Sequence, residues 1–124
     1  MSTVCLDTNV LIDYLRNVGE ASNFLENLPK RPAASVITIT ELIVGAKSSR
    51  DEQRIARLEN IVLFLPVTIE IARRAGQFTK HYRASHGIDD ADALIAATAE
   101  QHKLPLATLN VKHFPMFPKL KRAY

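Results

Sequence analysis

Three acidic residues, Asp7, Glu41 and Asp92, occupy similar places in the sequence, where an apolar run ends or a helical pattern begins. Asn110 follows a further apolar run. Carboxylates that converge without a counterion repel one another, and some of them must take up protons. A hard divalent cation removes this repulsion, and Mg²⁺ prefers oxygen ligands while keeping several of its waters. Such a cation beside an anionic substrate suits phosphodiester hydrolysis, because it lowers the pKa of bound water.

The segments that carry these residues predict an α/β fold. Short runs of apolar and branched residues predict strands, whereas apolar residues at intervals of three and four predict helices. Strands are predicted at 4–6, 33–37, 61–65 and 105–109, and helices at 10–15, 20–28, 38–48, 49–60, 68–85 and 89–102. Their alternation predicts a mostly parallel sheet of four or five strands with helices on both faces. The fifth would be a short edge strand in the tail 111–124.

The expected sheet brings the polar residues to one edge. In parallel strands, the strand ends and the starts of the following helices share an edge, and ligands bind there. Asp7 follows the first strand, and Glu41 and Asp92 each fall on the first turn of a predicted helix. We therefore expect the three carboxylates to converge, with Asn110 arriving from the fourth strand.

Each acid, taken alone, also has a structural explanation. Asp7 fits an ordinary turn residue. Glu41 fits a capping box with Thr38. Asp92 lies three residues after Asp89, a candidate N-cap, and acids at this place favour the helix dipole. For any single residue the structural explanation is the better one, and only the joint convergence of three carboxylates favours metal binding.

The composition fits a chain that folds around its own core. It has 124 residues, 47% of them hydrophobic, and a formal net charge of +3. We expect one domain spanning residues 1–124. No apolar run approaches the roughly 20 residues of a membrane helix, and no signal segment is evident, so we expect a cytoplasmic protein with no membrane partner. Cys5 is the only cysteine, which excludes an internal disulfide and fits a buried side chain.

Four segments resemble the PIN-domain nucleases and, among them, the VapC toxins of bacterial type II VapBC toxin–antitoxin pairs. The segments are Leu6–Ile12, Ile39–Leu42 with Gly45, Asp92–Ala99 and Leu106–Phe114. They occur in family order and span nearly the whole chain. The resemblance implies a single PIN domain at 1–124, folded as a three-layer α/β/α sandwich.

The resemblance also implies the activity, that of a Mg²⁺-dependent endoribonuclease, with Mn²⁺ as the other candidate ion and tRNA or rRNA as substrate. Asp7, Glu41 and Asp92 would then be the metal-binding and catalytic acids. The RNA, a cognate VapB-type antitoxin and a second copy of the chain would be the partners. Operator DNA would be contacted only through the antitoxin.

The family often supplies a fourth acid near the end of the fourth strand, and this chain departs from that pattern. Asn110 stands in the matching segment, and His113 stands where an acid is frequent. A second metal ion therefore remains an open question, with Asp89 as a substitute ligand. Three further polar residues are expected to orient the ligands or water, namely Thr8, Asn9 and Thr108.

Basic side chains would have to hold the RNA, because the acids repel phosphate. Contacts of this kind give salt-dependent affinity with little sequence information. The candidates are Arg50, Arg54, Arg57, Lys80, Arg83, His86, Lys112 and His113. For any single one of them, a solvated helix face is the simpler explanation.

Two other functions remain open. A PIN-fold binding module with weak catalysis is kept open by Asn110 in place of a fourth acid. Another metal-dependent phosphohydrolase would also place Asp7 at the sheet edge. A phosphatase with an aspartate nucleophile usually has a second acid two residues on, where this chain has Asn9. Such a phosphatase does not explain the run from Asp92 to Ala99, and intact Asp7, Glu41 and Asp92 argue against the binding module.

Overall fold

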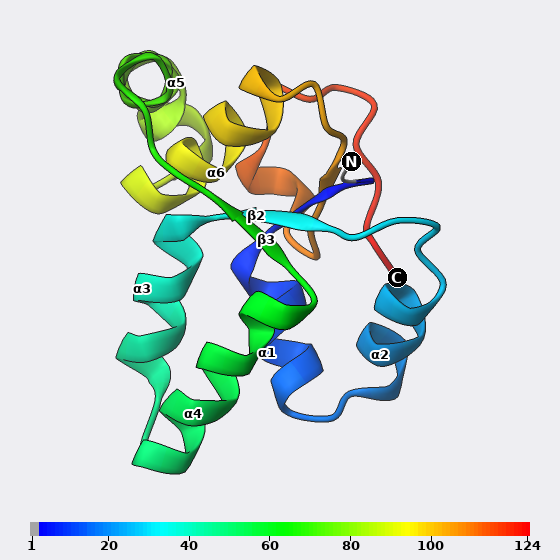
Figure 1. Cartoon of the computed structure of the whole chain (residues 1–124). Helices are drawn as coiled ribbons and strands as arrows, with labels where there is room; N and C mark the ends of the chain where they lie inside the picture. The colour runs from blue at the N-terminus through cyan, green and yellow to red at the C-terminus, as the bar shows by residue number, and fades with distance from the viewer. Residues whose placement is uncertain (1–2) are drawn as a thin grey trace.

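The computed structural model describes residues 3–124. Four short strands alternate with helices along these residues (Figure 1). The strands are β1 (Cys5–Leu6), β2 (Ala33–Ser35), β3 (Leu63–Leu65) and β4 (Leu106–Ala107). The helices are α1 (Thr8–Leu15), α2 (Gly19–Glu26), α3 (Val36–Gly45), α4 (Ser49–Arg57), α5 (Ile69–His86) and α6 (Asp90–Gln101), with 3-10 turns η1 (Leu58–Asn60) and η2 (Val111–His113).

The strands form one sheet in the order β3-β2-β1-β4, and every neighbouring pair is parallel. β1 is one of the two inner strands, with Cys5 opposite both Ala33 and Leu106. All residues of β1 and β2 are buried, as expected for a parallel sheet covered on both faces. The predicted parallel sheet is confirmed, and its strands are shorter than the apolar runs suggested.

Successive residues of a strand point to opposite faces, so β1 and β4 each contribute side chains to the hydrophobic cluster on each face of the sheet. Cys5 and Leu106 pack with α5 and α6 on one face, while Leu6 and Ala107 pack with α1, α3 and α4 on the other (Figure 1). The predicted three-layer α/β/α fold is thereby confirmed. Burial raises the pKa of the Cys5 thiol to about 12, which agrees with a packing role.

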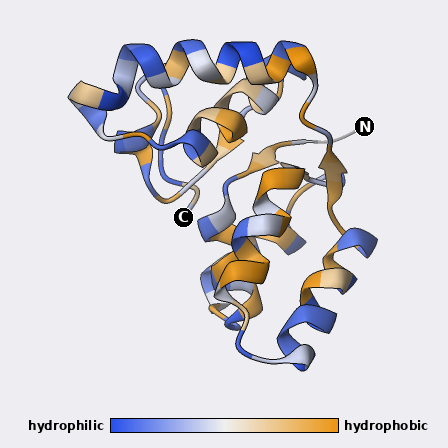
Figure 2. Cartoon of the chain, turned by 90° about the vertical axis from the view of Figure 1, so that its left-hand side faces the viewer, coloured by the Kyte–Doolittle hydropathy of each residue, from blue (hydrophilic) through white to orange (hydrophobic). Residues whose placement is uncertain are grey.

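The helices differ in how much of their surface is covered. α6 is buried nearly all round, through Ala93, Ile95, Ala96, Ala97, Thr98 and Ala99. α5 lies over α6 and has hydrophilic residues interspersed along its length (Figure 2). None of the described helices combines the length and the apolarity needed to cross a membrane.

The start of α3 differs from the prediction. The β-branched residues Val36 and Ile37 suggested a longer strand, but Ser35 caps the helix, and its hydroxyl accepts a hydrogen bond from the Ile37 backbone N–H at 3.2 Å. α3 therefore begins two residues earlier than predicted. Glu41 lies beyond the first turn, and its predicted capping box with Thr38 is wrong.

The tail after β4 contains no fifth strand within the described residues. Pro115 and Pro118 remove two backbone donors from it, which disfavours strand pairing. The tail nevertheless returns to the sheet edge, where the Ala123 N–H donates to the Thr108 carbonyl at 2.9 Å. The Tyr124 hydroxyl donates to Asp13 Oδ2 at 2.7 Å. The outer edge of β4 is thus partly covered by the tail.

Candidate active site

Asp7 is held between the end of β1 and the start of α1. It is the N-cap of α1, and its Oδ1 accepts a hydrogen bond from the Thr8 backbone N–H at 2.7 Å. Its Oδ2 accepts a hydrogen bond from the Thr108 hydroxyl, which comes from the end of β4, also at 2.7 Å. The residue is only 6% exposed. A carboxylate oxygen can accept more than one bond, so this capping role leaves Asp7 able to bind a cation.

Glu41 is held near Asp7 by hydrogen bonds between the hydroxyl groups of Thr8 and Thr38 and its own carboxylate. The Thr8 hydroxyl donates to Glu41 Oε1 at 2.6 Å. Because that hydroxyl has a single hydrogen, the Thr38 hydroxyl must donate to it across the 2.9 Å that separates the two oxygens. Thr38 is fully buried and lies one helical turn before Glu41. The spacing of three residues on one helix was the signal that could have revealed Thr38.

Asp92 contributes the third carboxylate from the first turn of α6. The predicted capping interaction with Asp89 is confirmed, because Asp89 Oδ1 accepts from the Asp92 N–H at 2.8 Å, and Asp92 Oδ2 accepts from the Asp89 N–H at 3.3 Å. His113 Nδ1 lies 3.1 Å from the same Asp92 Oδ2. All of these contacts to the Asp92 carboxylate involve Oδ2.

The remaining predicted polar residues support this edge from β4 and α1. The Asn110 backbone N–H donates to the Thr108 hydroxyl oxygen at 2.9 Å, which fixes the hydroxyl that faces Asp7. Asn9 Oδ1 accepts from the Leu109 N–H at 3.4 Å and so ties α1 to the end of β4. Thr8 and Thr108 therefore contact the acids directly, whereas Asn9 contacts backbone.

The electrostatics show that the acids are close neighbours. Burial raises the pKa of Asp7, and the charges of Glu41 and Asp89 raise it further, against the lowering effect of the hydrogen bonds from Thr108 and Thr8. Burial also raises the pKa of Asp92 to about 6, with the Asp89 and Asp7 charges adding to it. A pKa raised by neighbouring carboxylates marks a place where positive charge would be stabilised.

The donor atoms suit a hard divalent cation. Within residues 3–124, no three His, Cys, Asp or Glu side chains already stand close enough to enclose an ion. Mg²⁺ does not require such a cage, since it is usually held by one or two carboxylates and completes its octahedron with water. Asp7, Glu41, Asp92 and the amide of Asn110 offer the oxygen ligands that such an ion prefers.

Residues 4–119 match the PIN domain family. The chain belongs to the PIN-domain family. Ribonuclease VapC10 of Mycobacterium tuberculosis (strain ATCC 25618 / H37Rv) is 44% identical over 121 residues, covering 95% of this chain and 90% of the relative. Ribonuclease VapC19 of the same strain is 41% identical over 126 residues, covering 96% and 98%. A solved toxin-antitoxin complex from Klebsiella pneumoniae contains a chain with TM-score 0.82 and 34% identity, covering 98% of both chains. Within the PIN-domain family, these relatives assign the chain to the VapC group.

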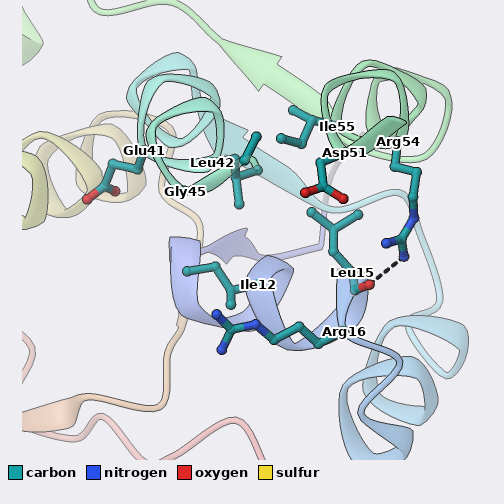
Figure 3. Close-up of a pocket in the computed structure, with 10 residues that line it drawn as sticks. Ile12, Leu15, Arg16, Glu41, Leu42, Gly45, Asp51, Arg54 and Ile55 are labelled. Atoms are coloured by element: carbon teal, nitrogen blue, oxygen red, sulfur yellow. Dashed lines mark hydrogen bonds between the residues drawn. The ribbon is translucent and has the colours of Figure 1, made fainter. Parts of the chain in front are cut away.

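A pocket of about 160 Å³ opens beside Glu41 of this PIN domain, between α1, α3 and α4 (Figure 3). Glu41 lies at one end of it, and Arg16, Asp51 and Arg54 lie toward the other. Apolar side chains line the middle: Ile12, Leu15, Leu42 and Ile55. The pocket therefore combines an apolar centre with an acidic end that reaches the candidate metal site.

The structure gives some predicted RNA-contact residues of the PIN domain other partners. Arg54 donates from Nη2 to the Leu15 carbonyl at the end of α1 (Figure 3). Arg83 forms an exposed ion pair with Asp90 at 2.9 Å. The others are placed as follows: Arg50 and Arg57 on α4, Lys80 and His86 on α5, and Lys112 beside His113 on η2. Among the predicted RNA-contact residues, His113 contacts one of the three acids, since its Nδ1 lies 3.1 Å from Asp92 Oδ2.

Proposed function

We propose that the protein is a Mg²⁺-dependent endoribonuclease and the toxin of a VapBC pair, with one PIN domain over residues 1–124. The proximity of Asp7 to Glu41, through the Thr8 hydroxyl, and to Asp92, through its charge, is the observation that carries this proposal. Burial raises the pKa of both Asp7 and Asp92. The charge of Glu41 raises that of Asp7 further, and the charge of Asp7 raises that of Asp92 further. VapC10 and VapC19, to which the chain is similar over nearly its whole length, are named as ribonucleases.

Asp7, Glu41 and Asp92 would hold Mg²⁺ or Mn²⁺, with Asp89 and Asn110 as further ligands. A bound ion supplies a water of lowered pKa near the scissile phosphodiester and stabilises the charge on the leaving oxygen. Thr108 and Thr8 act by orientation, since their hydroxyl groups fix Asp7 and Glu41 respectively. A fixed carboxylate need not reorganise when the ion and the RNA arrive.

The pocket between α1, α3 and α4 supports a VapB-type antitoxin as partner. Apolar side chains of the antitoxin would occupy its middle, and a basic side chain would reach Glu41 and cover the site. Operator DNA would then be bound through the antitoxin alone. The similar Klebsiella pneumoniae chain is part of a toxin-antitoxin complex, which supports the same partner class here.

A second copy of the chain is the other proposed protein partner. Ile43 and Val44 on α3 are 39% and 81% exposed, and Ile69 at the start of α5 is 68% exposed. Large exposed apolar side chains favour an interface. We further propose tRNA or rRNA as the substrate and the cytoplasm as the location, with Arg50, Lys80 and Lys112 as phosphate contacts.

The decisive test is cleavage of total cellular RNA by purified, antitoxin-free protein, with Mg²⁺ or with EDTA. Asp92→Asn removes a carboxylate of the site, whereas Asp90→Asn is a matched control, because Asp90 is two residues away, exposed, and paired with Arg83. We expect discrete fragments from the wild type and from Asp90→Asn in Mg²⁺, and none from Asp92→Asn or in EDTA. Cleavage that persists in EDTA would contradict the metal mechanism.

A folded, antitoxin-free protein that cleaves no RNA would instead support a PIN-fold binding module. Circular dichroism melting curves establish folding for each variant. Intact Asp7, Glu41 and Asp92 favour the enzyme over this alternative.

A further inference from the structure

His113 lies where two side chains of the candidate metal site meet. It belongs to η2, just after β4, and its Nδ1 lies 3.1 Å from Asp92 Oδ2. The same Nδ1 lies 2.9 Å from Asn110 Nδ2. Its side chain is 36% exposed and that of Asp92 is 17% exposed, so solvent ions can reach the group. An imidazole, a carboxylate and an amide therefore converge from α6 and the segment that follows β4.

With the Asn110 amide oriented as the structure has it, these three groups cannot all pair with one another by hydrogen bonds. If Nδ1 carries a hydrogen, it can donate to Asp92, but it then faces the N–H₂ group of Asn110, which is also a donor. If Nδ1 is bare, it can accept from Asn110, but its lone pair then faces the acceptor oxygen of Asp92. A cation resolves the conflict, because it binds the lone pairs of Nδ1 and Asp92 Oδ2 together. Rotation of the Asn110 amide by half a turn would present its oxygen instead, either to an Nδ1–H or, with Nδ1 bare, to the ion.

We infer that His113 is a metal ligand together with Asp92 and Asn110, and that it makes the site prefer Mn²⁺ to Mg²⁺. The inference rests on the proposed metal-dependent function. Adjacent ligand atoms around an octahedral ion with bonds near 2.1 Å lie about 3.0 Å apart. The 3.1 Å between His113 Nδ1 and Asp92 Oδ2 matches this separation. The two atoms are therefore already separated as two neighbouring ligands of one ion would be.

The chemistry of the ligand atoms decides which ion the site binds more tightly. Mg²⁺ is hard and prefers oxygen, whereas affinity for a site with nitrogen ligands rises from Mn²⁺ through the later divalent metals. An imidazole thus adds more to the binding of Mn²⁺ than to that of Mg²⁺. The Asp7 and Glu41 carboxylates contain oxygen donors alone, so they supply no such preference.

Electron paramagnetic resonance of Mn²⁺ bound to the purified, antitoxin-free protein tests the inference without any measurement of activity. We expect the wild type to show hyperfine coupling between Mn²⁺ and a directly bound ¹⁴N nucleus. His113→Asn should abolish this coupling and weaken Mn²⁺ binding by at least about tenfold. His102→Asn is the matched control, because His102 is exposed at the far end of α6, and it should retain both.

His113→Asp provides a second variant that keeps a ligand at the position. It should lose the nitrogen coupling, still bind Mn²⁺, and bind Mg²⁺ more tightly than the wild type does. Coupling to nitrogen that survives in His113→Asn would overturn the inference, as would wild-type Mn²⁺ binding that needs Asp92 and shows no nitrogen coupling. Neither result depends on RNA cleavage, so failure of the ligand assignment is distinguishable from failure of the proposed nuclease function.

Discussion

Asp7 and Asp92 present two ways of holding a carboxylate at the same sheet edge. Asp7 follows the inner strand β1, and two hydrogen bonds of 2.7 Å from Thr8 and Thr108 fix both of its oxygens. Asp92 stands on the first turn of a helix, and its Oδ2 has longer contacts of 3.3 Å and 3.1 Å, to Asp89 and His113. Asp7 is thus oriented before any ion arrives, whereas Asp92 can still adjust.

In the proposed metal site, this difference would give the two carboxylates different roles. A ligand that is already oriented adds precision, because little ordering remains when the ion binds. A ligand with weaker ties can follow the ion and the substrate as they move. Burial raises the pKa of both residues, and the charges of neighbouring carboxylates raise it further. A bound cation would relieve this repulsion.

The largest effect is expected from Asp7→Asn. Asparagine also caps helices well, so α1 should keep its start and the protein should fold. RNA cleavage should fall by more than about 100-fold, because loss of a group behind a metal ligand alone costs about 10–100-fold. Cleavage rates in Mg²⁺ and a melting curve measure the two effects. An active Asp7→Asn protein would remove Asp7 from the ligand set.

The next effect tests whether orientation by Thr108 matters. Thr108→Val keeps the side-chain shape and removes the hydroxyl that donates to Asp7, so cleavage should fall about 10–100-fold. The free energy of unfolding should fall by about 1–3 kcal/mol, as for an unsatisfied buried group. Thr98→Val is the control, because Thr98 is equally buried but donates to the Leu94 carbonyl within α6. Equal cleavage by the two variants would refute the orienting role.

A third effect concerns pH and metal removal. The Asp92 pKa is raised to about 6, so the folded protein binds a proton more tightly than the unfolded chain. Without metal, the contribution of Asp92 to stability should therefore decrease as pH rises from about 4 to about 6. Mg²⁺ should oppose this decrease, because it favours the ionised form. Melting temperatures in EDTA and in Mg²⁺ across this range measure it, and Asp92→Asn should show a flatter curve in EDTA.

The smallest effect is expected from the tail that supports the Asp7 side of the site. Tyr124→Phe removes the hydroxyl that donates to Asp13 and should lower the free energy of unfolding by about 1 kcal/mol. Cleavage should stay unchanged, because the Ala123 bond to the Thr108 carbonyl is retained. A double-mutant cycle with Asp13→Ala isolates the pair, and a coupling energy near zero would show that the bond adds nothing.

The sequence predicted the parallel sheet and the placement of Asp7 and Asp92, because strand ends and helix starts have strong local patterns. The predicted start of α3 is wrong, because the Ser35 cap prevails over the strand preference of the β-branched Val36 and Ile37. The contact between His113 and Asp92 could not be predicted, because it depends on the path of an irregular segment. The same holds for Arg54, whose bond to the Leu15 carbonyl depends on how α4 packs against α1.

The hydrogen bond from Thr108 to Asp7 joins residues 101 positions apart in the chain. On the ribosome, Asp7 is made early and Thr108 late, and contacts between such distant segments are slow to form. The orientation of Asp7 must therefore wait until the chain has been translated past Thr108. A nascent or prematurely terminated chain would lack the oriented site, and synthesis itself would delay the appearance of the proposed nuclease activity.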